Sequence, residues 1–136
     1  MPYELQVVGR VFSPLADPAD APRQGDEGAP EARLVFETAI AECLDGLAVG
    51  DEMLVLTWLH LADRDLLTVF PRGDRSRRAQ GVFTTRAPHR PNPIGVHRVV
   101  VTAVEGTTVV VSGMEAVDGT PILDMKPVLK ESISER

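Results

Sequence analysis

The sequence predicts a mostly-β fold, a small barrel or a sandwich with one or two short helices and long loops. Two observations lead to this prediction. Short runs rich in Val, Leu, Ile, Thr and Phe recur along the chain, and most are bounded by Gly, Pro or Asp. Helical periodicity is weak, while 11 Gly and 11 Pro indicate many turns. The 136 residues suffice for one core, so we expect a single domain over 1–136.

The expected strands are, in order, 5–12, 32–39, 51–60, 66–70, 99–104, 107–112 and 121–129. The fifth and sixth runs flank Glu105-Gly106, which predicts a hairpin because a two-residue turn ending in Gly joins two β-branched runs. The last run has Pro at both ends of its core, so we expect it at an edge or in an irregular segment. Residues 39–48 are expected to form two or three helical turns before a turn at Gly50-Asp51.

Two further features concern order and redox state. The segment 13–33 has the composition of a loop, and its length indicates that it is functional or mobile; we expect it to be mobile. Cys43 is the chain's single cysteine, which excludes an internal disulfide and most zinc sites. We expect Cys43 to be a small core residue rather than a nucleophile, because free cysteines are among the most buried residues.

Composition excludes several classes of protein. Apolar residues make up 43% of the chain and charged residues 25%, as is typical of globular proteins. No apolar stretch approaches the roughly 18 to 20 residues of a membrane helix, and the N-terminus does not resemble a signal peptide, so we expect a cytoplasmic protein. The common nucleotide-binding, hydrolase and metalloprotease motifs are absent. The histidines, His60, His89 and His97, are not spaced like ligands, and we expect no metal.

The charge is unevenly distributed along the chain. The formal net charge of −6, taken alone, argues against a nucleic-acid partner. Residues 72–98, however, hold seven arginines against the single acid Asp74, and the remaining residues carry the whole excess of acidic groups. The positive segment is therefore either a solvated loop or the basic mouth of a site that receives an RNA loop.

The segment 81–97, GVFTTRAPHRPNPIGVH, stands out chemically. Three Pro within six residues stiffen its backbone. Arg86 and Arg90 are rigid forks suited to a carboxylate or a phosphate, and Asn92 is held between two Pro. Gly95 permits either the close approach of a ligand or a positive φ. The segment is either a functional loop or a surface loop with solvated arginines.

Three other features have both a structural and a functional interpretation. Residues 118–121, Asp-Gly-Thr-Pro, are first of all a turn, but Glu115, Asp118, Asp124 and Lys126 lie within or close to it. Carboxylates beside an exposed turn can bind a ribose or a cationic ligand. Residues 22–24 form an ordinary loop on composition alone, and a histidine at a strand end, such as His60, more often makes a structural hydrogen bond.

The blocks GVFTTRAPHRPNPIG and VDGTPILDMKP, preceded by VGRVFSP and APRQ, resemble the TsaA-like (YaeB, TrmO) family in order and spacing. The resemblance covers essentially the whole chain. It implies a small β-barrel that dimerises, binds S-adenosylmethionine and transfers its methyl group. The activity implied is N6-methylation of threonylcarbamoyl-adenosine at position 37 of tRNA, with the anticodon loop as partner.

The resemblance also implies site residues. Cofactor contacts would fall on Pro22, Arg23, Gln24, His60, Leu61, Arg86, Val96, Glu115, Ala116, Val117 and Asp118. Substrate contacts would fall on Arg90, Asn92, Asp124 and Lys126. The hydrogen-bond acceptor that removes the N6 proton would be Asp118, Asp124 or the Asn92 side-chain oxygen. Arg90 or Lys126 would bind the threonylcarbamoyl carboxylate or a phosphate.

The chain departs from the family pattern at three places. Phe12 stands where a basic residue often precedes Ser-Pro, and His97 stands where Ser often follows Gly-Val. The chain also ends soon after the last block, so we expect no additional C-terminal domain. Two alternatives to a tRNA methyltransferase therefore stay open, namely a small-molecule methyltransferase of the same fold and a non-catalytic module that binds S-adenosylmethionine and regulates a partner.

Overall fold

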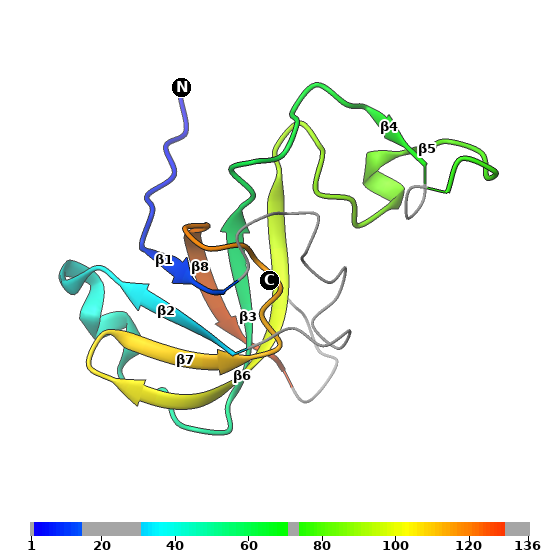
Figure 1. The fold of residues 1–136 in the computed structure, drawn as a ribbon. Coiled ribbons are helices and arrows are strands. Elements are labelled where there is room, and N and C mark those ends of the chain that lie inside the picture. The colour runs from blue at the N-terminus through cyan, green and yellow to red at the C-terminus, as the bar shows by residue number, and fades with distance from the viewer. Residues whose placement is uncertain (1, 15–30, 71–73, 130–136) are drawn as a thin grey trace.

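A computed structural model describes residues 2–14, 31–70 and 74–129. Six antiparallel strands close into a ring in the order β1-β2-β7-β6-β3-β8, which confirms the prediction of a mostly-β barrel (Figure 1). Their bounds are β1 Gly9–Phe12, β2 Ala32–Phe36, β3 Glu52–Trp58, β6 Ile94–Glu105, β7 Thr108–Ser112 and β8 Pro121–Pro127. A separate pair comprises β4 Thr68–Val69 and β5 Gln80–Gly81, and the 3-10 helices are η3 Thr38–Leu44 and η5 Val82–Thr84.

Alternation of side chains along the strands builds the core. Inward and outward positions alternate strictly in β2, β3, β7 and most of β6, as expected for strands that cover one apolar interior. The residues that are almost fully buried are Val11, Leu34, Val55, Val99, Val101, Val109, Val111, Met114 and Ile122. Among the described residues, the buried polar side chains are Thr57, His97 and Thr120.

The hairpin predicted at 105–106 is confirmed, because β6 and β7 pair from Glu105 opposite Thr108 and Gly106 has a φ of +63°. The first strand of this hairpin is longer than predicted. It begins at Ile94 rather than at residue 99, so the end of the Pro-rich segment is already part of the barrel. Pro93 immediately precedes the first strand residue, where the missing N–H is tolerated.

Of the two expectations for the last strand, an edge position is wrong, whereas an irregularity is present. β8 pairs with β1 on one side and with β3 on the other. Its two prolines occupy the first and last positions of the strand, and the ladder shifts register opposite Leu56 and Thr57. Proline is therefore compatible with an interior strand here because it stands only at the strand ends.

Two local predictions also need correction. Residues 38–44 form a 3-10 helix, so the helical turns predicted over 39–48 are present but end at Leu44, and Cys43 is exposed rather than buried. Ile40 and Leu44 of this helix pack against the core, and their spacing leaves Cys43 pointing to solvent. The predicted first strand is shorter as well, since residues 5–8 precede β1 and only 9–12 are strand.

Residues 59–70 and 74–93 form an arm that projects from one end of the barrel and carries β4, β5 and η5 (Figure 1). The arm leaves the barrel at the end of β3 and returns at the start of β6, where Trp58 pairs with Ile94. Exposed apolar side chains on the arm include Leu67 and Phe83. No helix in the described parts of the chain is both long and apolar enough to cross a membrane.

Candidate functional site

A buried polar group lies inside the barrel where β3 and β6 approach the arm. Thr57 and His97 both point inward from these neighbouring strands. The Thr57 hydroxyl oxygen lies 2.7 Å from Nε2 of His97. His97 is only 4% exposed, so this hydrogen bond is shielded from water.

The hydrogen bond between Thr57 and His97 requires a glycine at position 95. Gly95 lies directly opposite Thr57 in the ladder, and a Cβ atom built there would lie 2.6 Å from the Thr57 hydroxyl and 2.7 Å from Nε2 of His97. A glycine at this position is therefore explained by close approach rather than by a positive φ, and the groups that approach it are the side chains of Thr57 and His97. Its neighbour Val96 points to the outer face and is half-exposed.

The opposite side of the His97 ring contacts the segment after β7. Nδ1 of His97 is hydrogen-bonded to Oε1 of Glu115, a residue of the predicted cofactor set. A carboxylate only accepts hydrogen bonds, so Nδ1 is the protonated nitrogen when Glu115 is ionised. Nε2 of a neutral ring then accepts from the Thr57 hydroxyl. The three side chains thus form one chain of hydrogen bonds that ends at Glu115.

The segment 114–120 is held to the barrel as a turn. Gly119 has a φ of +86° and donates to the Val11 carbonyl at 2.7 Å. Oδ1 of Asp118 accepts from the Ser13 backbone N–H at 3.0 Å. Ala116 and Val117 are buried, so ligand contacts at these two positions would involve the backbone. The turn interpretation of Asp-Gly-Thr-Pro is therefore confirmed, and it leaves room for the functional one.

A depression of about 410 Å³ lies beside Asp118. Its walls are formed by Phe12, Ser13, Pro14, Glu31, Ala32, Arg33, Val110 and Asp118. Pro14 and Glu31 are the last and first described residues on either side of the 15–30 segment. The predicted residues Pro22, Arg23 and Gln24 lie outside the described residues.

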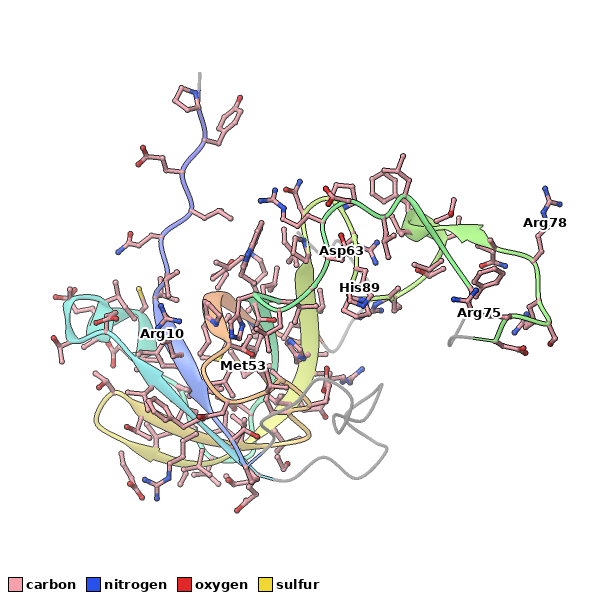
Figure 2. All side chains as sticks on the ribbon, turned by 45° about the horizontal axis from the view of Figure 1, so that its top comes forward. Arg10, Met53, Asp63, Arg75, Arg78 and His89 are labelled. Carbon is pink, nitrogen blue, oxygen red and sulfur yellow. The ribbon has the colours of Figure 1, made fainter. Side chains whose placement is uncertain are left out.

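Arg64, near the base of the arm, holds the Pro-rich loop in place through hydrogen bonds. Arg64 donates from Nε to the Pro91 carbonyl at 2.8 Å and from Nη2 to the Asn92 side-chain oxygen at 3.2 Å. Its guanidinium also lies over the Trp58 ring, 5.0 Å from the centroid. Asn92 thus commits its acceptor to Arg64 and presents its N–H groups as donors. Nearby, the Asp63 backbone N–H donates to Nδ1 of His89 (Figure 2).

The arginines of 74–98, the described part of the basic segment, do not form one surface. Arg90 donates to the Thr85 and Ala87 carbonyls of its own loop, at 3.1 and 2.8 Å. Arg98 makes an exposed ion pair with Glu52 on the barrel wall. Arg75 and Arg78 lie at the far end of the arm (Figure 2). Besides Arg64, the exposed arginines of the arm are Arg75, Arg77, Arg78 and Arg86, whereas Arg72 lies outside the described residues.

The remaining predicted residues lie apart from the buried group. His60 and Leu61 are exposed at the base of the arm, just after β3. Asp124 and Lys126 point outward from β8 and form an ion pair of 3.2 Å with each other. A second, apolar depression is lined by Leu5, Val7, Trp58, Pro121 and Leu123. His60, Leu61, Arg86 and Val96 line neither this depression nor the one beside Asp118. The described residues gather no group of three or more His, Cys, Asp or Glu side chains suited to a metal.

The sequence pattern alone does not identify Thr57, Arg64 or His97 as parts of a site. His97 falls in the Pro-rich segment, and its inward direction follows only once the strand is known to begin at 94. Alternation from Gly95 then places His97, Val99 and Val101 inside, which is the signal that would identify it. Arg64 carries no comparable signal, because its partners are 27 and 28 residues away.

Comparison with known proteins identifies relatives over nearly the whole chain. The model of the tRNA-methyltransferase O N-terminal domain matches residues 10–132. A "Probable S-adenosyl-L-methionine-binding protein" of Methanothermobacter thermautotrophicus is 40% identical over 131 residues, 96% of this chain and 93% of that protein. An "S-adenosyl-L-methionine-binding protein" of Archaeoglobus fulgidus is 38% identical over 122 residues, covering 90% of this chain and 86% of its own.

Solved structures show the same fold. A crystal structure of TrmO superposes with a TM-score of 0.78 at 30% identity, and one of TrmO from Pseudomonas aeruginosa with a TM-score of 0.77 at 28% identity. Both matches cover 100% of this chain, but only 62% and 61% of the solved chains. The chain therefore spans about three fifths of the length of these structures.

Proposed function

The chain belongs to the family of the tRNA-methyltransferase O N-terminal domain, and on this premise we propose that it is an S-adenosylmethionine-dependent tRNA methyltransferase. The match over residues 10–132 carries the proposal. The proposed reaction is methylation of N6 of threonylcarbamoyl-adenosine at position 37. The carbon–sulfur bond of the sulfonium breaks, a carbon–nitrogen bond forms, the N6 proton passes to an acceptor and S-adenosylhomocysteine leaves.

The proposed cofactor site includes the depression beside Asp118. Relatives of the chain are named as S-adenosylmethionine-binding proteins. Pro14 and Glu31, the described residues that flank the segment with Pro22, Arg23 and Gln24 in the sequence, line this depression. The backbone N–H groups of residues 115–117 donate to no other described residue, so they are available to a ligand. Acceptors and donors thus lie together, as recognition of a nucleoside with an amino-acid tail requires.

We assign the proton acceptor to Asp118 among the three candidates. Asn92 uses its side-chain oxygen to accept from Arg64. Asp124 points outward from β8 and pairs with Lys126. Asp118 keeps Oδ2 without a hydrogen bond among the described residues while Oδ1 holds the Ser13 backbone. An anchored carboxylate with one unoccupied oxygen suits a general base, because its position is fixed before the methyl group arrives.

The proposed tRNA partner would contact the arm. Residues 74–93 carry five arginines and one aspartate, in contrast to the acidic chain as a whole. Phe83 is 85% exposed there, and exposed aromatic rings can stack on unpaired bases. Arg75 lies 5.2 Å from the Phe70 ring centroid, a contact that orders the tip of the arm. Arg90, turned to its own loop, is expected to shape the loop rather than bind substrate directly.

A homodimer is part of the proposal. Four apolar side chains that are 37–40% exposed form an interrupted stripe on the outer face of β6, namely Ile94, Val96, Val100 and Val104, with Arg98 and Thr102 between them. Such a stripe is unfavourable in water and is suited to a second copy of the chain. Light scattering should give twice the chain mass, and Val100→Glu should shift it to the monomer. A monomeric wild-type protein would exclude this part of the proposal.

The test of activity uses the whole chain. The protein is incubated with methyl-labelled S-adenosylmethionine and total tRNA, and the digested nucleosides are examined by mass spectrometry. We expect methylated threonylcarbamoyl-adenosine. The variant with Arg75, Arg77 and Arg78 all changed to Ala should bind tRNA more weakly, with a salt slope reduced by about 2 to 3, and bind the cofactor normally. Cofactor binding without any RNA product would favour the regulatory module, and a labelled small molecule would favour the alternative enzyme.

A further inference from the structure

We propose that His97 is a positioning residue that fixes the Glu115 carboxylate for contact with the cofactor; this inference rests on the proposed function. The first observation is burial. Thr57 and His97 are almost completely buried, whereas the Glu115 side chain is 15% exposed. The hydrogen-bonded chain therefore begins in the core and ends at the barrel surface, on the segment next to Asp118.

The second observation is that the two oxygens of the Glu115 carboxylate differ in their hydrogen bonding. Oε1 is bound by Nδ1 of His97, and Oε2 forms no hydrogen bond with a described residue. Glutamate has three rotatable side-chain bonds, and leaving them free costs rotamer entropy when a ligand binds. Because His97 holds one oxygen of this partly exposed side chain, the position of the other oxygen is fixed as well. That oxygen is suited to accept from the hydroxyl pair of a ribose or from an ammonium group.

The third observation is that the imidazole itself cannot turn. Thr57 holds Nε2 from the opposite side of the ring, and Gly95 leaves only enough room for this contact. A ring held at both nitrogens has one orientation and one neutral tautomer, with the proton on Nδ1. The barrel interior thereby fixes a carboxylate at its surface through a single side chain.

Two substitutions separate the two bonds of the ring. The side-chain amide of Asn ends where Nδ1 of His lies, so His97→Asn can still donate to Glu115 but loses Thr57. The amide of Gln reaches the position of Nε2, so His97→Gln can still meet Thr57 but loses Glu115. Both variants remove the buried ring, so a merely structural role would affect them alike.

The measurement is the dissociation constant for S-adenosylmethionine by calorimetry, with the melting temperature as a parallel readout. We expect His97→Gln to weaken binding about tenfold or more and His97→Asn to stay within about threefold, at similar melting temperatures. Glu115→Gln should weaken binding as much as His97→Gln. Equal affinities for the two His97 variants would overturn the inference, whereas absence of cofactor binding by the wild-type protein would overturn the proposed function itself.

A second measurement needs no variant at position 97. The 15N shifts of the His97 ring in the wild-type protein should report a proton on Nδ1. A proton on Nε2 alone would mean that Glu115 is not held as described and would contradict the proposal, whether or not the substituted proteins fold.

Discussion

Each barrel strand pairs with two neighbours around an apolar interior, whereas the arm has one pair of two-residue strands and is fastened by side chains. Removing a side chain from the barrel therefore opens a cavity in a packed core. Removing one from the arm breaks individual polar contacts, of which those of Arg64 are the most numerous. The comparison indicates that the barrel sets stability while the arm can be altered at little cost to the fold.

The largest difference is expected for the same substitution in the two regions. Leu34→Ala, at a fully buried position of β2, should lower the free energy of unfolding by about 2–5 kcal/mol. Leu67→Ala, at a 70% exposed position of the arm, should change it by less than about 0.5 kcal/mol. Urea denaturation checks both. Similar losses at the two positions would mean that the arm is part of the cooperative core.

A methyl group added to glycine gives the next contrast. Gly95→Ala should destabilise the barrel by about 1–3 kcal/mol, because the new Cβ would push Thr57 and His97 apart. Gly81→Ala, on the arm, meets nothing within 4 Å and has an ordinary φ of −59°, so it should be nearly neutral. Thermal unfolding of both variants checks the prediction, and an unaffected Gly95→Ala protein would refute the crowding described at the barrel end.

Removal of Arg64 should loosen the arm without unfolding the barrel. Arg64→Ala loses two hydrogen bonds and the contact with Trp58. Exchange of the backbone amides of Asp63 and Ile94 should become about tenfold faster, while that of Val55 stays unchanged. Arg77→Ala, an exposed position at the tip, is the matched control. If exchange in Arg64→Ala became faster at all three amides, the arm and the barrel would instead unfold as one cooperative unit.

The smallest effect is electrostatic and confined to the tip of the arm. The Ser76 hydroxyl and backbone N–H both donate to Asp74 and lower the pKa of its carboxyl below the usual 3.8. A depressed folded pKa stabilises the turn above pH 3.8, and this contribution disappears as pH falls through the folded pKa. An NMR titration should locate that lower pKa, and Ser76→Ala should raise it toward 3.8. An unchanged value in Ser76→Ala would contradict the assignment.

The sequence made the barrel predictable because strand periodicity is a local signal. The hairpin at Gly106 and the strands β2, β3 and β7 follow directly from it. The prolines of β8 led to the wrong prediction of an edge strand, because their effect depends on whether they stand at the ends of the strand. Cys43 was misplaced because the direction of a side chain on a short helix depends on which neighbours, here Ile40 and Leu44, reach the core.

The candidate site was harder to predict because its contacts are non-local. The chemistry-bearing segments are visible in the sequence, but their internal pairings are not. Arg64 reaches Asn92 across the arm, and Thr57 reaches His97 across two strands. Only the closed barrel brings such residues together. For the same reason the sequence does not distinguish Arg90 from Arg98, although Arg90 bonds to its own loop and Arg98 pairs with Glu52 on the barrel.

The pairing of Trp58 with Ile94 has a consequence for how the molecule can be modified. Since β3 and β6 are adjacent antiparallel strands, everything between them is an oversized hairpin loop. A short Gly-containing turn in its place would leave the order of strands in the barrel intact. The arm can thus be exchanged as a unit, which allows its length and charge to vary while the barrel is preserved.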